Sequence, residues 1–349
     1  MASIDDHGGW PALLAALLDR THLTAEQAHA AMSTILRGDA SPAQLIGFVV
    51  ALRAKGETPA ELAGLLDAVL EHAAIVPLGD ELRSSAVDIV GTGGDQSHSI
   101  NVSTMAAIVT AGAGVPVCKH GARAASSKCG TADVLEALGV AVELSPEGVA
   151  HCVRTAGIGF CLAPAFHPAF RFAAPARREI GIPTVFNLLG PMANPGRVRR
   201  QVIGVANASF AERMVETLRT HGSIHAWIVH GGGLDELTTT GPSEVIELRD
   251  GRISHFRVDA EEYGLAGART SDLTGGEPAE NAAAVRRVLA GEPGPHRDIV
   301  VLNAGAGLVV GGRAANLAEG IAIARGTIDS GAAAETLDRF VAVSNEAAG

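Results

Sequence analysis

The stretch VDIVGTGGDQSHSINVSTMAAI, residues 87–108, decides how this chain folds. Its opening apolar run breaks into the glycine-rich loop 91–95, and a helix-like apolar run begins at Asn101. A second β-like run at 115–118 leads into KHGARAASS, residues 119–127, and another helix-like run follows. Strands that alternate with helices predict an α/β protein with a mostly parallel sheet, in which the loops after neighbouring strands meet at one edge.

Both loops are suited to binding an anion. Glycines lack a Cβ and let the backbone approach a ligand, and a helix that begins just beyond a loop directs unpaired N–H groups at it. The polar groups that the two loops add are those of Asn101, Ser103, Thr104, Lys119, Arg123, Ser126 and Ser127. The first loop alone could be an ordinary turn, but the second holds a compact set of phosphate-type donors. One phosphorylated ligand shared by both loops is therefore the better hypothesis.

The same residues carry a resemblance to a known family. GTGGD (91–95), NVST (101–104) and KHGARAASSKCGTADVLEALG (119–139) resemble the signature of the anthranilate phosphoribosyltransferases, which are built like nucleoside phosphorylases. The similarity runs from about Ala12 to Asn345. It implies a pentosyltransferase of tryptophan biosynthesis that moves the phosphoribosyl group of 5-phosphoribosyl 1-diphosphate to the amine of anthranilate and releases diphosphate. It also implies Mg²⁺ as cofactor and a homodimer joined through a helical domain.

The expected fold is a small all-helical N-terminal domain plus a larger α/β domain with a mostly parallel central sheet. Residues 1–76 should be helical, because Thr24, Ser41 and Thr58 each begin a capping box before an apolar run. A segment near 165–195 should return to this domain, and 77–349 should form the α/β domain that binds the diphosphate substrate. The candidate strands are 87–90, 115–118, 140–144, 159–163, 202–206, 225–229 and 299–302.

An apolar run at 227–229 ends in a glycine-rich turn and the acid pair Asp235-Glu236. Paired acids beside a phosphate site suit Mg²⁺, which prefers oxygen ligands. An exposed acid pair on the surface is the alternative, but the resemblance places the family's metal-binding acids at these two positions, with Ser103 as a third ligand.

The resemblance assigns the remaining substrate contacts residue by residue. Binding of phosphoribosyl diphosphate is expected at Gly91, Gly94, Asp95, Ser99, Asn101, Val102, Ser103, Thr104, Lys119, His120, Gly121, Ala122, Arg123, Ala124, Ala125, Ser126, Ser127 and Thr131. Binding of the acceptor is expected at Gly91, Ala122 and Arg177. No covalent nucleophile is expected, because a neutral aryl amine attacks without a strong base.

Two positions depart from the family pattern. Ala122 stands where the family has an Asn against the aromatic substrate, and Pro183 stands where it has an Arg. Ala122 has no side-chain hydrogen bond to offer, and Pro183 has neither a guanidinium nor a backbone N–H. The chain could therefore use another aromatic amine or a carboxylate-bearing acceptor, or hold anthranilate weakly, or neighbouring residues could offset the changes.

Composition argues against several other functions. A net charge of −11 disfavours nucleic acid as a partner and so disfavours a non-catalytic nucleic-acid-binding relative. Cleavage of nucleosides by phosphate is a further alternative, for which a different glycine loop would be expected.

The four cysteines show no CxxC spacing, which favours free thiols. No apolar run is long enough to span a membrane, so we expect a cytoplasmic protein without a membrane partner.

Overall fold

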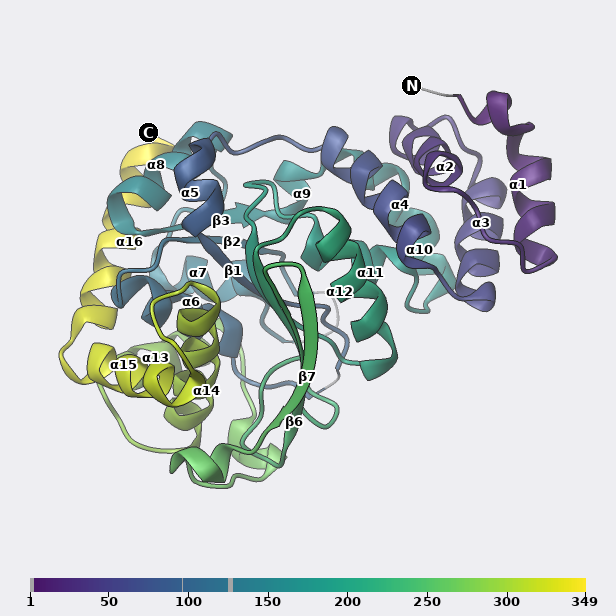
Figure 1. The fold of residues 1–349 in the computed structure, drawn as a ribbon. Helices are drawn as coiled ribbons and strands as arrows, with labels where there is room; N and C mark the ends of the chain where they lie inside the picture. Colours follow the sequence, from purple (N-terminus) through teal and green to yellow (C-terminus); the bar gives the residue numbers. More distant parts are fainter. Residues whose placement is uncertain (1–2, 96, 125–127) are drawn as a thin grey trace.

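The computed structural model describes residues 3–95, 97–124 and 128–349. A bundle of N-terminal helices stands beside a larger body in which helices pack on both faces of a twisted sheet (Figure 1). The α/β body with a mostly parallel sheet and the all-helical N-terminal part confirm the predicted fold class. Among the helices of the described residues, none has the length and apolar character needed to cross a bilayer.

The N-terminal helices begin where the capping residues predict. Thr24, Ser41 and Thr58 each accept the N–H of the residue three positions on, and that residue's side chain bonds back to the cap. Pro42 and Pro59 occupy the first helical position, where the missing N–H costs nothing. The helices of this part are α1 (Gly9–Leu18), α2 (Ala25–Arg37), α3 (Pro42–Lys55) and α4 (Pro59–Glu71), preceded by the 3₁₀ turn η1 (Ile4–His7).

The central sheet of the described residues has the strand order β3-β2-β1-β4-β5-β6-β7. Its first five strands in this order run parallel, and β6 and β7 add an antiparallel hairpin. The strands are β1 (Val87–Gly91), β2 (Val117–Gly121), β3 (Ile158–Leu162), β4 (Arg200–Gly204), β5 (His225–His230), β6 (Ser243–Arg249) and β7 (Arg252–Val258).

Two strand predictions are wrong. Residues 140–144 form no strand: they connect two helices, and Val140, Val142 and Leu144 alternate only because they pack into the core. Residues 299–302 lie inside helix α14 (Pro295–Val310), which is buried along most of its length. A short apolar run does not distinguish a buried helix from a buried strand.

The β6–β7 hairpin was not predicted, although its turn has a recognisable signal. Asp250 and Gly251 both adopt positive φ, at 50° and 79°, as a two-residue hairpin turn requires. Trp227 of β5 packs edge-on against Phe256 of β7, with ring centroids 5.1 Å apart.

Helices cover the two faces of the sheet with separate apolar cores. One core joins the sheet to α6, α7, α8 and α13 to α16, and the other joins its opposite face to α11, α12 and the N-terminal helices. The helices of the α/β body are α5 (Gly79–Ser85), α6 (Val102–Gly112), α7 (Thr131–Leu138), α8 (Pro146–Ala156), α12 (Ala211–Thr220), α13 (Pro278–Leu289), α14, α15 (Leu317–Asp329) and α16 (Ala332–Ala348), with 3₁₀ turns η3 (Ala208–Phe210), η4 (Ala260–Tyr263) and η5 (Thr270–Leu273).

The chain leaves the sheet after β3 and packs against the N-terminal helices before it returns as β4. This segment contains α9 (Ala163–Phe166), the 3₁₀ turn η2 (Pro168–Phe172), α10 (Ala174–Ile180) and α11 (Val185–Met192). Ala173, Ala176 and Phe186 share one buried cluster with residues of α2, α3 and α4. The returning segment therefore connects the helical part to the sheet.

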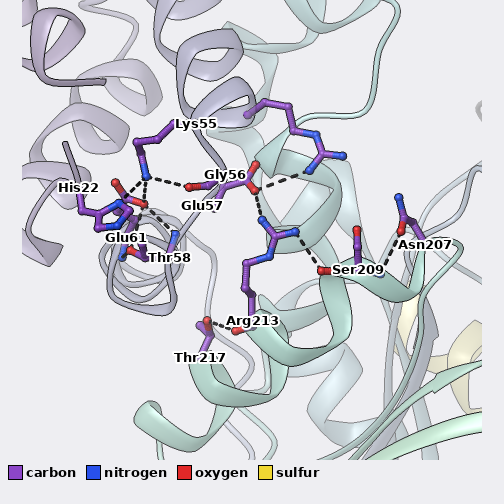
Figure 2. Close-up of polar contacts among 11 residues, drawn as sticks. His22, Lys55, Gly56, Glu57, Thr58, Glu61, Asn207, Ser209, Arg213 and Thr217 are labelled. Atoms are coloured by element: carbon purple, nitrogen blue, oxygen red, sulfur yellow. Dashed lines mark hydrogen bonds and ion pairs between the residues drawn. The ribbon is translucent and has the colours of Figure 1, made fainter. Parts of the chain in front are cut away.

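A buried ion pair also joins the two parts. Glu57, in the turn between α3 and α4, accepts a hydrogen bond from Arg213 of α12 at 2.7 Å (Figure 2). The Arg53 and Arg213 guanidinium groups lie 4.5 and 5.4 Å from the centroid of the Phe210 ring. One turn further along, Glu61 accepts hydrogen bonds from Lys55 and from the Leu23 N–H, which stabilise the α3–α4 connection.

Candidate active site

A cavity of about 630 Å³ opens at the carboxyl ends of β1, β2 and β5. Ligand sites of open parallel sheets lie at this edge. The structure brings the two predicted phosphate loops and the acid pair around this one space. The predicted residues that line it are Gly91, Gly94, Asp95, Ser99, Asn101, Val102, Ser103, Lys119, His120, Gly121, Ala122, Arg123, Ala124, Thr131, Asp235 and Glu236.

Not every predicted contact lies on the wall. Thr104 is buried in helix α6, only 1% exposed, and Arg177 lies in α10 outside the lining residues. The predicted contacts at Ala125, Ser126 and Ser127 lie outside the described residues.

Close packing of the acid turn against β1 and β4 explains two of the glycines. A Cβ on Gly91 would overlap the Asp235 carboxylate, and a Cβ on Gly204 would overlap the Asp235 backbone. The Asp235 carboxylate also accepts the Gly93 N–H at 2.6 Å. The glycine loop and the acid pair, which are about 140 residues apart in the chain, therefore form one unit.

Helix α6 begins at the cavity wall, which Asn101, Val102 and Ser103 line. Its N-cap residue, Asn101, makes no side-chain capping bond, because the amide is used elsewhere. It donates to the Cys129 carbonyl at 3.2 Å and accepts from Asn281 at 2.8 Å. The Val102 N–H bonds to the Ile100 carbonyl at 2.7 Å, and the Ser103 N–H bonds to the Glu236 carboxylate. What the start of the helix offers an anion is therefore its positive dipole end.

Lys119 is the buried cation of the site, with only 2% of its surface exposed. Its ammonium donates to the Ile89 carbonyl and lies 3.3 Å from the Ser103 hydroxyl at the start of α6. Burial lowers the pKa of Lys119, while Asp88, Glu236 and Asp235 oppose the shift. The Lys119 ammonium is therefore held by hydrogen bonds to Ile89 and Ser103 and is shielded from solvent.

The acids opposite Lys119 crowd one another. Burial raises the pKa of Asp235 to about 7, and the charge of Asp95 adds to this shift. Burial and the Asp235 charge raise the pKa of Glu236 well above its usual range. Asn303 of α14 fixes the turn by accepting the Leu237 N–H at 3.0 Å and donating to the Leu237 carbonyl at 2.8 Å.

This set of oxygens fits a divalent cation that is shared with a ligand. Crowded carboxylates with raised pKa values are stabilised by a cation, and Mg²⁺ takes one or two carboxylates together with waters and substrate phosphates. Within 3–95, 97–124 and 128–349, no group of three His, Cys, Asp or Glu side chains forms a complete metal site by itself.

The second loop is closed by an acid that sequence reasoning missed. Asp133 of α7 accepts the N–H groups of Ala124 at 2.9 Å and Gly130 at 2.8 Å. Arg123 bonds with Glu136, Asp133 and Glu143, and these acids, Glu136 foremost, raise the pKa of Arg123. Its guanidinium is therefore paired with carboxylates, so its availability to a phosphate depends on exchange with them.

Aromatic contacts connect the cavity to the predicted acceptor residue Arg177. The ring of His120 lies 5.1 Å from His167, which stacks on Phe170 at 5.2 Å, and Phe170 meets Phe186 edge-on at 5.6 Å. The Arg177 guanidinium lies 5.0 Å from the Phe186 ring centroid. Burial lowers the pKa of His120 to about 3 and that of His167 to about 4, so both rings are neutral at neutral pH.

The sequence analysis also did not identify Asp88 and Asn194, two buried residues that bond to each other beneath the cavity. Asp88 of β1 accepts the His120 N–H at 3.1 Å and the Asn194 amide at 2.8 Å. Burial raises the pKa of Asp88 to about 6, while Lys119 opposes the shift. The only sequence signal was a charged residue inside an apolar strand, which could have indicated a buried polar contact.

The two-domain fold is that of the glycosyl transferase family. The models of the glycosyl transferase family match residues 83–334 for the a/b domain and residues 11–73 for the helical bundle domain. The chain is 50% identical to the anthranilate phosphoribosyltransferase of Salinispora arenicola, over 96% of this chain and 97% of that one. It is 52% identical to that of Chloroflexus aggregans, over 95% and 97%. The chain therefore belongs to the anthranilate phosphoribosyltransferase family.

Solved structures agree with this assignment. The anthranilate phosphoribosyltransferase of Thermus thermophilus superposes with a TM-score of 0.90 at 42% identity, over 95% of this chain and 99% of that one. The Saccharomyces cerevisiae enzyme, solved in complex with PRPP and Mg, gives a TM-score of 0.87 at 29% identity, over 97% and 98%.

Proposed function

We infer that this protein transfers the phosphoribosyl group of 5-phosphoribosyl 1-diphosphate to the amine of anthranilate, giving N-(5-phosphoribosyl)anthranilate and diphosphate. The observation that carries this function is the meeting of the α6 N-terminus, Lys119 and the acid pair Asp235-Glu236 around one cavity. Such a space holds a diphosphate on one wall and its counter-cation on the other.

The chain's own residues supply binding and positioning rather than covalent chemistry. The positive end of α6 and the Lys119 ammonium would stabilise the diphosphate as its bond to the anomeric carbon breaks. Ser103, Asp235 and Glu236 would hold Mg²⁺, which neutralises the negative charge that develops on the leaving diphosphate. The amine then attacks a cationic, oxocarbenium-like sugar without a strong base, so orientation of the two substrates carries the catalysis.

The acceptor is proposed to lie between the cavity and the returning segment. Arg177 would bind the carboxylate of anthranilate, and its contact with Phe186 supports an aromatic lining beside it. Gly91 and Ala122 would line the inner end. The neutral state of His120 agrees with a wall that orients an aromatic ring and makes no proton transfer.

Diphosphate release tests this function directly. Wild-type protein is incubated with phosphoribosyl diphosphate, Mg²⁺ and a panel of aromatic amines, and release is compared with that in EDTA. Anthranilate should give the highest kcat/KM. Release with another amine but not with anthranilate would favour the second candidate, a paralogue with a different acceptor, which Ala122 and Pro183 motivate. Binding of single-stranded DNA without turnover would instead support the non-catalytic alternative.

A homodimer is also proposed, with the N-terminal helices as its interface. Leu18 of α1 is 75% exposed and Val50 of α3 is 38% exposed, so both leave apolar surface on the helical part. Light scattering should give about twice the chain mass of 35.5 kDa, and Leu18→Glu should shift it toward a monomer. A cytoplasmic location is also proposed, in keeping with four cysteines that are all buried.

A further inference from the structure

The contact between strands β1 and β2 differs from those on either side of it. β1 pairs with β4 at five positions and β2 with β3 at five, but β1 pairs with β2 only at Val87↔Val117. Because the phosphate loops follow β1 and β2, this incomplete pairing lies directly beneath the cavity. The β1–β2 ladder therefore stops short beneath the loops that line the cavity.

The backbone groups that would have continued the pairing bond to side chains instead. Alternate residues of β2 face β1, because the Val87 N–H bonds to Pro116 while the Val117 N–H bonds to Gly157 on the other side. The next groups toward β1 are the Cys118 carbonyl and the His120 N–H. The first accepts from Asn194 at 2.8 Å, and the second donates to Asp88 at 3.1 Å.

Asp88 and Asn194 also bond to each other, so the replacement is a connected network. The Asn194 amide donates to Asp88 and Cys118 together, and its oxygen accepts the Gly196 N–H at 2.8 Å. Both residues are buried, with exposures of 0% and 2%. On the opposite face of the strands, Lys119 donates to the Ile89 carbonyl, a third group facing the gap.

We propose that Asp88 and Asn194 are positioning residues for phosphoribosyl transfer, which hold β1 and β2 apart beyond Val87 and so set the spacing between the two phosphate loops. The role of the two residues between the strands stands on the structure alone. Only the purpose of the spacing, which is to bind the diphosphate substrate, rests on the proposed function. Asp88 has no other evident reason to be charged, because a buried carboxylate is costly unless its hydrogen bonds compensate. Its proximity to Lys119 adds the electrostatic compensation that a neutral side chain would not supply.

The first test compares Asp88→Asn and Asn194→Ala with wild type in equilibrium binding of phosphoribosyl diphosphate with Mg²⁺, and in steady-state kinetics. Each variant should bind this substrate at least about tenfold more weakly, equivalent to roughly 1.4 kcal/mol. Glu61→Gln is the control, since Glu61 is an equally buried acid in the helical domain with several hydrogen bonds.

The outcomes separate positioning from simple destabilisation. Binding within about twofold of wild type in both folded single variants would overturn the proposal. An equal loss of binding in Glu61→Gln would do the same, because it would trace the effect to general stability. If Asp88→Asn does not fold, Asn194→Ala still decides.

A second measurement does not depend on the enzymatic reaction. Amide exchange of His120 should accelerate in Asp88→Ala, while the amides of Lys119 and Gly121, which face β3, should keep wild-type rates. Unchanged His120 exchange would refute the role of Asp88 between the strands. Failure of wild type to release diphosphate, with this exchange pattern intact, would instead count against the proposed function.

Discussion

Glu57 of the helical part and Arg213 of α12 form an ion pair across the junction of the fold, with Oε2 and Nη1 2.7 Å apart and the Glu57 side chain fully buried (Figure 2). Arg53 stands farther off, at 3.7 Å. Removing Arg213 leaves the buried carboxylate with the weaker partner only, and loss of a charged hydrogen bond costs more than loss of a neutral one.

We therefore expect Arg213→Ala to lower the free energy of unfolding by roughly 1.5–3 kcal/mol in urea denaturation. Arg219→Ala is the matched control, because Arg219 pairs with Glu216 on the exposed face of the same helix. It should cost less than about 0.5 kcal/mol. Equal losses in the two variants would contradict the importance of the junction pair.

Replacing Asp235 and Glu236 by Asn and Gln should lower kcat severely while the thermal midpoint stays close to that of wild type. Two crowded, buried carboxylates are costly without a cation, so their neutral isosteres should not harm folding. Isothermal titration should show that Mg²⁺-dependent binding of phosphoribosyl diphosphate is lost. Unchanged diphosphate release in this double variant would refute the metal assignment.

Lys119→Ala should weaken phosphoribosyl diphosphate more than the aromatic acceptor. It removes a charge-assisted contact worth roughly 1.5–3 kcal/mol, or at least about tenfold in affinity. Arg123→Ala should act in the same direction but less strongly, because Arg123 must first leave Glu136. Calorimetric titration decides: wild-type affinity in Lys119→Ala would mean that this end of β2 does not bind the substrate.

Ala122→Asn should lower the KM for anthranilate if the acceptor site is relaxed, because Asn adds a donor and an acceptor on the cavity wall. Steady-state kinetics at saturating phosphoribosyl diphosphate would measure it. If wild type already uses anthranilate efficiently and the variant gains nothing, Ala122 and Pro183 have no effect on the choice of acceptor.

The stability of Asp88→Asn relative to wild type should depend on pH. The folded pKa of Asp88, about 6, lies above its ordinary value of 3.8, so folded wild type holds a proton that the unfolded chain has lost between these values. As the pH rises from about 4 to about 6, the free energy of unfolding of wild type should therefore fall by up to about 3 kcal/mol. Asp88→Asn has no carboxyl group at this position, so its free energy of unfolding should not show this fall. Denaturation from pH 4 to 8 measures the difference, and a constant difference would contradict the shift.

Local signals in the sequence were sufficient for the helical part and for the position of the loops. Capping boxes at Thr24, Ser41 and Thr58 act within one turn of helix, so they were readable without tertiary contacts. The loop after 87–90, the loop after β2 and the acid pair were readable for a similar reason, because the parallel order of strands brings the residues after them to one edge. The bounds of the second strand were wrong: it was predicted at 115–118 but runs from Val117 to Gly121, so Lys119 lies in β2.

Tertiary structure decided what these residues contact. Residues 299–302 have the apolar character of a strand, but they lie inside the buried helix α14. The pairing of Arg123 with Glu136 depends on the packing of α7 beneath the second loop. Asp88 and Asn194 lie 106 positions apart, and neither shows its role until the strands separate and their backbone groups need other partners. Hydrogen-bond partners that are distant in the chain leave no periodic pattern, so only the folded arrangement reveals them.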